Sequence, residues 1–415
     1  MKENQKIRQQ VLDRFLAYCQ VNTRSNHEVD EIPSSKGQFE LAELIKKEME
    51  AMGLSDVELD DHSYLYGCLK ASDGVEAPVI TLCAHLDTSP DASGENVKPI
   101  IRKYEGKALS FPDDNEMTLS ETDCHVLKDF WGEEIITASG LTLLGADDKA
   151  GIAEIMTTME ILCANPDIKH PEIRLVFTPD EETGRGTSYI KREKLGDFAY
   201  TMDGGRMGEL EDECFNAWSV KIDFTGVNVH PGESKNRMIN AIAIAARFVA
   251  ALPEWESPEH TEKREGFYHV GEMSGDESYA KLDMIIRDFE EKNNLFRIEY
   301  LKSLADSFEK KYKGLKITVK SKESYRNMYE ILKEYPKTTE IAEKAIEMAG
   351  IQVIKTAIRG GTDGARLSFM GLPTPNIFTG GLLFHSKKEW IPVIALEKAV
   401  ETLLNILTLW SAEKK

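Results

Sequence analysis

The sequence has little of what secreted, membrane-spanning or disulfide-stabilised proteins need. Its longest apolar runs fall well short of the ~20 residues of a transmembrane helix, so we expect no membrane partner. Its six cysteines include no Cys-x-x-Cys pair and stand mostly in apolar patterns, which indicates reduced core thiols in a cytoplasmic protein. Near the N-terminus, Ile7, Val11 and Phe15 recur at helical spacing, which predicts an amphipathic helix and no signal peptide.

Basic residues are also scarce, because 51 Lys and Arg stand against 71 Asp and Glu, for a formal net charge of -20. This balance argues against nucleic acid as a partner. The chain has no Gly-x-Ser-x-Gly motif and no cysteine with a local nucleophile signature, so we expect no covalent catalysis by Ser or Cys. Its 415 residues, without an internal repeat or low-complexity tract, exceed what one core usually serves and predict two domains.

Five side chains of the types that bind metals are present, each just after an apolar, strand-like run. They are His85, Asp147, Glu182, Asp203 and His385. Each histidine could supply a nitrogen to one of two metal ions, Glu182 and Asp203 could each supply a carboxylate to one ion, and Asp147 could bridge the pair. Zinc accepts such a mixed nitrogen and oxygen shell. The set predicts a hydrolase with two Zn²⁺ ions per chain.

Each motif alone has a plainer explanation. His85-Leu86-Asp87 could be a surface pair, and Asp147 could be an acid favoured at a helix N-terminus. The three acids ending at Glu182 could form a solvated turn, Asp203 precedes a glycine as in many turns, and a lone His385 is more often structural. The joint interpretation is favoured because five independent coincidences would all have to fall at strand ends.

Two further carboxylates stand beside these candidate ligands. Asp87 lies two residues after His85, and on an extended chain such residues point to the same side, so Asp87 could accept the second imidazole N–H. Glu181 precedes Glu182, and adjacent side chains diverge. Glu182 could therefore bind metal while Glu181 acts as a general base on the same water.

Strand-like and helical patterns alternate through residue 208, which predicts a doubly wound α/β domain. The expected elements of this part are a helix at 35–52, a strand at 78–84, a helix at 148–164 and strands at 172–178 and 198–202. The pattern then changes to strand 217–224, helix 238–252, strands 267–273 and 281–289, helix 295–312 and strand 315–321. This βαββαβ order predicts a ferredoxin-like α+β insert at 209–324. The remaining elements are a helix at 338–348, a strand at 353–357 and a helix at 394–410, which complete a discontinuous catalytic domain of 1–208 and 325–415.

Taken together, the motifs resemble those of the aminoacylase and carboxypeptidase G class of cocatalytic zinc peptidases. The motifs are His-Leu-Asp, Gly-Ala-Asp-Asp-Lys, Asp-Glu-Glu-Thr-Gly, Met-Asp-Gly-Gly and Phe-His-Ser. Longer stretches, such as 226–232 and 358–364, are similar to the members of this class that cleave tripeptides. The resemblance implies a zinc-peptidase catalytic domain with an inserted lid domain, and removal of the N-terminal residue from tripeptides.

The resemblance also implies three substrate-binding residues. His230 would help to hold the carbonyl oxygen when the insert closes, although a histidine in a turn is often only solvated. Arg287 and Arg359 would recognise a carboxylate, although each alone is more typical of a surface ion pair. The expected partner is a short peptide, and an insert of this type, which also serves for dimerisation, leaves a homodimer as an expectation.

Two other functions remain open on the sequence. A dipeptidase or an N-acyl-amino-acid deacylase of the same class would share the metal site. A non-catalytic zinc-binding or peptide-binding protein could share the fold, but the presence of Asp87 and Glu181 argues against it, because binding metal needs neither.

Overall fold

The computed structural model describes residues 2–414, and the side chains of residues 5–414. These residues divide into two compact units. Unit 1 comprises the described residues of Met1–Asp212, Glu330–Thr356 and Thr362–Lys415, and unit 2 comprises Glu213–Tyr329 and Ala357–Gly361. Unit 2 therefore begins and ends a few residues later than the expected insert of 209–324, and it includes a short second segment. That unit 2 acts as a lid stays a prediction.

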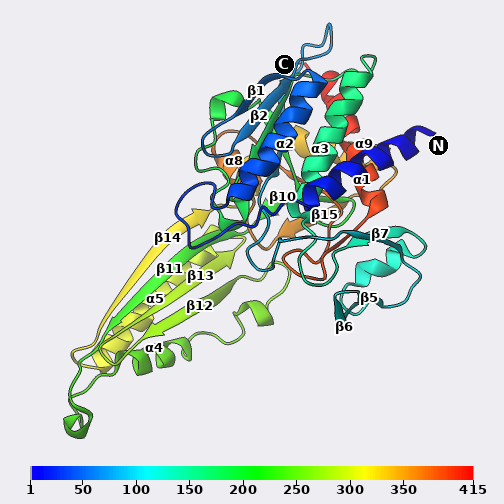
Figure 1. Ribbon diagram of the computed structural model, residues 1–415. Helices are drawn as coiled ribbons and strands as arrows, with labels where there is room; N and C mark the ends of the chain where they lie inside the picture. Colours follow the sequence, from blue (N-terminus) through cyan, green and yellow to red (C-terminus); the bar gives the residue numbers. More distant parts are fainter. Residues whose placement is uncertain (1, 415) are drawn as a thin grey trace. The chain divides into compact units, whose positions relative to one another are not determined.

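Unit 1 is built on an eight-stranded sheet (Figure 1). The strands, in spatial order, are β1 (Ser55–Leu59), β2 (Leu65–Leu69), β8 (Ile173–Thr178), β3 (Ile80–His85), β9 (Phe198–Gly204), β16 (Asn376–Phe378), β10 (Glu209–Cys214) and β15 (Ile354–Ile358). The central strands β8, β3, β9 and β16 run parallel. All six residues of β3 are buried, as expected for a parallel strand that is covered on both faces. The carboxyl ends of these strands consequently meet at one edge of the sheet, where ligands gather in α/β folds.

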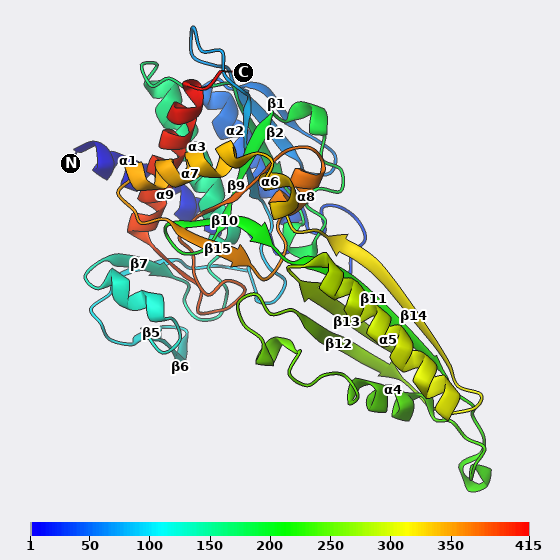
Figure 2. The ribbon, with the colours of Figure 1, turned by 180° about the vertical axis from the view of Figure 1, so that it is seen from behind.

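Both faces of this sheet are covered (Figure 2). The helices of the larger layer are α1 (Lys2–Cys19), α2 (Lys36–Met52), α3 (Ala146–Ala164), α7 (Pro336–Met348) and α9 (Val393–Ser411). They form one core with strand residues such as Leu82 and Leu175. The next residues along the same strands, Cys83 and Val176, belong to a second core with Leu367 of α8 (Asp363–Phe369). This period of two gives the doubly wound arrangement that the alternation predicted.

Unit 1 also contains short elements that the sequence did not predict. Besides β1, β2, β10, β16 and α8, they are β4 (Ile100–Lys103), β5 (Leu109–Phe111), β6 (Asp114–Leu119), β7 (Glu134–Thr137), α6 (Tyr329–Leu332) and β17 (Trp390–Pro392), of which α6 starts at the boundary with unit 2. Strands β17, β7 and β4 form one small sheet, and β5 pairs with β6. Strands β17, β7 and β4 are too short for a recognisable apolar pattern and are placed by pairing between distant segments, whereas β5 and β6 are neighbours in the chain.

Unit 2 is a four-stranded antiparallel sheet with two helices. Its elements are β11 (Asn216–Thr225), α4 (Ala241–Val249), β12 (Phe267–Gly275), β13 (Tyr279–Asp288), α5 (Glu291–Lys311) and β14 (Lys316–Tyr325). The spatial order β12-β13-β11-β14 is that of a ferredoxin-like fold, as predicted. Helix α4 starts later than expected because the Asn240 side chain caps it by accepting from the Ala243 amide.

Two further expectations can be compared with the structure. No helix within residues 2–414 has the length and apolar character needed to cross a membrane. None of the six cysteines, all of which lie in the described residues, forms a disulfide, and five of the six are buried.

Candidate metal centre

The five candidate metal ligands all belong to unit 1 and come from the edge of the sheet where the parallel strands end. His85 is the last residue of β3, and Asp203 lies near the end of β9. Asp147 is in the first turn of α3, and Glu182 is in a short 3-10 helix, η2 (Glu181–Thr183), which follows β8. His385 lies between β16 and β17.

The side chains of these residues converge into two sets that share Asp147. In set A, His85 Nε2 lies 2.8 Å from Asp147 Oδ1 and 3.5 Å from Asp203 Oδ1. In set B, His385 Nε2 lies 3.3 Å from Asp147 Oδ2 and 2.9 Å from Glu182 Oε2. Each set therefore has one imidazole nitrogen and two carboxylates, and each oxygen of Asp147 faces a different histidine. This is the arrangement that a bridging carboxylate between two metal ions requires.

The residues present fit a divalent metal by their chemistry. The side chain of Glu182 is only 5% exposed, and its Oε1 has no hydrogen-bond partner among the described residues. A buried carboxylate oxygen without a partner is costly, and a bound cation would satisfy it. Ligand atoms of His85 in set A, Glu182 in set B and the shared Asp147 all lie within 4.8 Å of one another, so the two sets are close together.

A second group of similar compactness contains Asp148 beside His85 and Asp203. Asp148 Oδ2 accepts a hydrogen bond of 2.9 Å from the backbone amide of His85, and its side chain is fully buried. Because this oxygen already holds the end of β3, we assign Asp148 to the support of His85. Set A therefore keeps Asp147 and Asp203 as its two carboxylates. Oδ1 of Asp147 faces the ring nitrogen of His85 directly.

The protonation of the cluster indicates that it is adapted to a cation. Burial alone would lower the pKa of His85, but the neighbouring carboxylates, Asp147 first among them, outweigh burial and hold that pKa well above its ordinary value. Bonds to Asp147 and Glu182 raise the pKa of His385 to about 11. Burial, with the charge of Asp147, raises the pKa of Glu182 to about 8. Because metal ligands must be deprotonated, metal binding at these residues should release protons.

Asp87 has a role that the sequence did not reveal. Its carboxylate accepts the backbone amide of Glu181 at 2.9 Å and that of Glu182 at 3.2 Å. Its expected contact with His85 is longer, since Oδ1 lies 3.4 Å from Nδ1 while the Asp87 carbonyl oxygen lies at 3.0 Å. Asp87 thus contacts the imidazole through its carbonyl oxygen and fixes the backbone of η2 through its buried carboxylate. Only the adjacency of β3 and β8 brings these residues together.

The loop that carries η2 is fixed at its start as well. Asp180 has a left-handed backbone with φ of 54°, and its buried carboxylate accepts from the Ser34 amide, from Gln38 and from Arg185. Glu181 follows it and is half-buried. Burial raises the pKa of Glu181 well above its ordinary value, and the charges of nearby acids add to this effect. A carboxyl group with a raised pKa is a stronger base, which suits proton transfer.

The candidate substrate residues His230 and Arg287 belong to unit 2. His230 precedes a short 3-10 helix, η4 (Pro231–Glu233), and its Nδ1 accepts from the Gly232 amide at 3.2 Å. Arg287 on β13 donates from Nη1 to the Arg359 carbonyl at 3.1 Å, and its buried Nε has no partner among the described residues. The Nε–H donor of Arg287 is therefore not used by the described residues.

The expected contact of Arg359 with a substrate carboxylate stays a prediction, and the structure shows which groups its guanidinium contacts within unit 2. Its guanidinium donates to the carbonyls of Lys263 and Glu265 and to Thr261. The same group lies over two aromatic rings, at 5.1 Å from the centre of Phe215 and 5.6 Å from that of Phe267. Through Nη1 and Nη2, Arg359 holds the chain segment 261–265 within unit 2.

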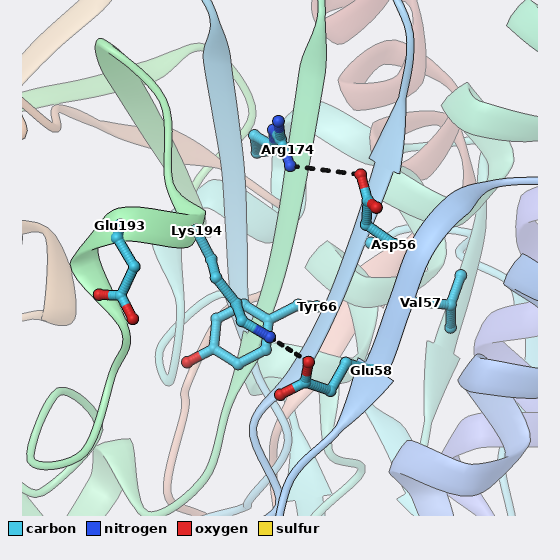
Figure 3. Close-up of a pocket in the computed structure, with 8 residues that line it drawn as sticks. Asp56, Val57, Glu58, Tyr66, Arg174, Glu193 and Lys194 are labelled. Atoms are coloured by element: carbon cyan, nitrogen blue, oxygen red, sulfur yellow. Dashed lines mark ion pairs between the residues drawn. The ribbon is translucent and has the colours of Figure 1, made fainter.

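A hollow of about 370 Å³ lies elsewhere in unit 1 (Figure 3). Its lining comes from β1, β2, β8 and the short helix η3 (Arg192–Lys194) and consists of Asp56, Val57, Glu58, Tyr66, Gly67, Arg174, Glu193 and Lys194. Most of its charges pair with one another, as Figure 3 shows for Lys194 with Glu58 and for Arg174 with Asp56. None of the five candidate ligands lines this hollow, so the metal cluster is the stronger candidate for catalysis.

Comparison with known proteins agrees with the geometry. Residues 144–409 match the family described as Peptidase family M20/M25/M40. A curated relative, Peptidase T of Clostridium perfringens, is 47% identical over 406 residues, which cover 97% of this chain and 99% of the relative. The solved structure of a tripeptidase from Staphylococcus aureus matches with a TM-score of 0.78 at 21% identity, over 98% of this chain and 99% of that one. The aminopeptidase PepT from Bacillus cereus gives a TM-score of 0.75 at 22% identity, with the same coverage.

The two solved structures show that the fold is shared, and the identity with the curated relative extends along almost the whole chain. The family match begins at residue 144, so it includes four of the five candidate ligands and leaves out only His85. The chain therefore belongs to peptidase family M20/M25/M40 and is a hydrolase of peptide bonds, a metallo-aminopeptidase.

Proposed function

We propose that this enzyme releases the N-terminal residue from tripeptides at a centre of two zinc ions, with Glu181 as the general base. The observation that carries the proposal is the division of the ligands into set A and set B around Asp147. The choice of tripeptides is supported by the names of its relatives, Peptidase T and a tripeptidase. Zinc is the proposed metal because two imidazoles and three carboxylates suit it.

Set A would hold one ion and set B the other, with Asp147 contributing one oxygen to each. When bound, the two ions would supply Lewis-acid activation of the attacking water and of the scissile carbonyl. Two separate ligand sets explain why the chain has two histidines at the site. The shared carboxylate explains why both of its oxygens face ring nitrogens.

Glu181 would take a proton from the attacking water and pass it to the leaving amine. The pKa of Glu181, which burial raises above its ordinary value, supports both steps, because a carboxylate with a raised pKa accepts a proton more readily and still returns it as an acid. Asp87 would keep the base in position by holding the amides of Glu181 and Glu182. The positions of ligand and base are thus coupled through one carboxylate.

On the substrate side, we keep His230 as the residue that holds the carbonyl oxygen and Arg287 as the one that binds the C-terminal carboxylate. The free Nε–H of Arg287 supports this choice. We assign Arg359 to the support of Arg287, because it offers its carbonyl oxygen to Arg287 Nη1. We also propose a cytoplasmic location, supported by the absence of disulfides among the six cysteines, and a homodimer through unit 2.

The test combines metal analysis with a substrate panel of di-, tri- and tetrapeptides and N-acylated amino acids. We expect two divalent ions per chain and a marked preference for tripeptides with a free N-terminal amine. A preference for dipeptides would point to a dipeptidase, and hydrolysis of the acylated amino acids to a deacylase. Either result would refute the tripeptide assignment, although the metal centre could remain correct.

A further inference from the structure

Glu389 is a buried glutamate close to the candidate ligands that the mechanism above does not use. Glu389 as a whole residue is only 1% exposed. Its Oε2 accepts the backbone amides of Leu144 at 2.7 Å and Gly145 at 2.8 Å, and its Oε1 accepts the amide of Asp147 at 3.1 Å. All three donors belong to the turn that presents the shared ligand Asp147. Hydrogen bonds from amides to a carboxylate are charge-assisted and stronger than neutral ones.

One of these bonds, from the amide of Asp147, supplies a cap that the sequence of α3 lacks, and the other two hold the residues just before the helix. The residue before α3 is Gly145, which has a φ of 86° and no side chain to accept the free amides of the first turn. Such amides need an acceptor, and a helix N-terminus favours a negative charge. Glu389 provides both from a segment more than 240 residues away, since it lies 242 residues from Asp147 in the chain.

Glu389 also belongs to the loop that carries His385. This loop is closed at its base, because Leu382 and Trp390 exchange backbone hydrogen bonds of 2.9 and 3.0 Å. His385 sits inside it with a left-handed backbone, at φ of 61°. The loop is therefore a compact unit, and its side-chain anchor on the turn of Asp147 is Glu389.

We propose that Glu389 is a positioning residue that sets the distance between Asp147 and His385 and thereby shapes set B. This inference rests on the proposed metal centre and deepens it. Set B takes two of its three ligands from the segments that Glu389 ties together, whereas set A takes one. Removal of the tie should therefore weaken metal binding at set B more than at set A. Residues that orient metal ligands typically contribute about 10–100-fold in metal affinity.

The experiment is a stepwise Co²⁺ titration of the metal-free protein, followed by calorimetry and by the visible absorption of Co²⁺. The variants are Glu389→Ala, which loses all three bonds, Glu389→Gln, which keeps one oxygen, and Glu389→Asp, whose shorter side chain keeps the charge. The matched control is Glu397→Gln. Glu397 is also a buried glutamate of the C-terminal segment, but its charge-assisted bond of 2.6 Å goes to Arg8.

We expect the dissociation constant of one step, that of set B, to rise about 10–100-fold in Glu389→Ala and Glu389→Gln, with a smaller change in the other step. The absorption of the Co²⁺ bound in the affected step should change with it, and Glu389→Asp should recover part of both effects. The control should lower the melting temperature and leave both steps unchanged.

Unchanged affinities in Glu389→Gln and Glu389→Asp would overturn the role of Glu389, while two bound ions in the wild type would leave the proposed centre intact. An equal loss in both steps would also overturn it, because a general loss of stability has no preference for set B. A wild type that binds only one Co²⁺ would instead refute the dinuclear centre itself.

Discussion

Asp147 is the residue on which the metal centre depends, because each of its carboxylate oxygens faces a different histidine. The positions of His85 and His385 in the chain could not show this division. Residue types indicated the candidate ligands, but which oxygen of Asp147 faces which ring depends on the turn at the start of α3. In that turn, Asp147 itself departs from helical backbone angles, with φ of -85° and ψ of 105°.

Replacing Glu181 or its neighbour Glu182 by glutamine should affect different properties of the enzyme, kcat in the first variant and metal content in the second. We expect Glu181→Gln to keep both metal ions and to lose at least ~10²-fold in kcat, the lower end of what general-base catalysis contributes. We expect Glu182→Gln to lose metal first, because Oε2 of this residue faces His385 at 2.9 Å. Metal content and kcat, measured side by side in both variants, check this. Equal metal loss in the two would mean that base and ligand are not separate residues.

Glu154 allows a test that concerns stability alone. Both of its carboxylate oxygens are buried in α3 without a hydrogen-bond partner among the described residues, and burial raises its pKa well above the ordinary value. The folded state then holds a proton that the unfolded state releases above its own pKa. Stability should therefore fall as pH rises between the unfolded and folded pKa values, by up to about 1.4 kcal/mol per pH unit for one proton.

Glu154→Gln removes this proton linkage. The variant should gain free energy of unfolding relative to the wild type, and the gain should be larger at pH 8 than at pH 5. Urea denaturation at the two pH values measures it. An equal effect at both would show that the carboxyl group is solvated or paired in solution.

At the scale of elements, the long apolar segments were predictable and the short ones were not. The predicted strand 78–84 corresponds to β3 (Ile80–His85), and the predicted helix 394–410 to α9 (Val393–Ser411), because each is buried along its length or along one face. Strand β1, with an exposed residue at alternate positions, carries no such signal. Its place at the sheet edge follows from pairing with β2.

The hydrogen bonds by which Asp87 and Glu389 support the candidate ligands could not be predicted from the sequence either. Asp87 could be assigned to His85 from their spacing alone, but its bonds to the amides of η2 require β3 and β8 to be neighbours. Glu389 acts on α3 from the far end of the chain. The elements could be predicted, whereas contacts between distant elements depend on strand order and register.

The packing of α3 on β9 can be tested at Gly151. A Cβ added there would lie 2.1 Å from the carbonyl oxygen of Met202 and 2.4 Å from Asp148 Oδ1. Gly151→Ala must therefore push α3 away from β9 at the point where Asp147 and Asp203 face His85. We expect a loss of ~1–3 kcal/mol in the free energy of unfolding, as for other overpacked sites, together with lower metal content.

The control for Gly151→Ala is Gly271→Ala in β12, where the added Cβ would meet only the Asp283 carbonyl oxygen at an ordinary 3.7 Å. Denaturation curves and metal analysis of both variants make the comparison. Wild-type stability and full metal content in Gly151→Ala would contradict the close packing of α3 against β9.

At the scale of the whole molecule, the sequence predicted two architectures in one chain. The βαββαβ order of unit 2 could be predicted because each of its elements has its own apolar pattern, such as the alternation of buried and more exposed residues along β11. The short segment Ala357–Gly361, which joins unit 2 from much later in the chain, could not be predicted. It is placed by tertiary contacts, among them the bonds of Arg359 to Thr261.

The proposed use of Arg287 makes a prediction about substrate length and charge. Replacing Arg287 by alanine should reduce kcat/KM for a tripeptide by the equivalent of roughly 1.5–3 kcal/mol, the contribution of a hydrogen bond to a charged group. The corresponding tripeptide amide should lose far less, because it has no carboxylate to bind. Equal losses on acid and amide would show that Arg287 does not recognise the carboxylate.

Lys355→Ala is a suitable control for the loss of a positive charge, since Lys355 pairs with Glu343 and Asp212 in unit 1 and not with substrate in this account. Its kcat/KM for acid and amide should keep the wild-type ratio. A changed ratio in this control would mean that net charge, rather than one contact, sets the preference.

Whether two metal ions share Asp147 is decided by the metal content per chain of the wild type and of Asp147→Ala. We expect two divalent ions per chain in the wild type, loss of hydrolysis on addition of a chelator, and a loss of both occupancy and most activity in the variant. The physical reason is that each of set A and set B takes one oxygen from Asp147. Two fully occupied sites and normal rates in Asp147→Ala would contradict the account.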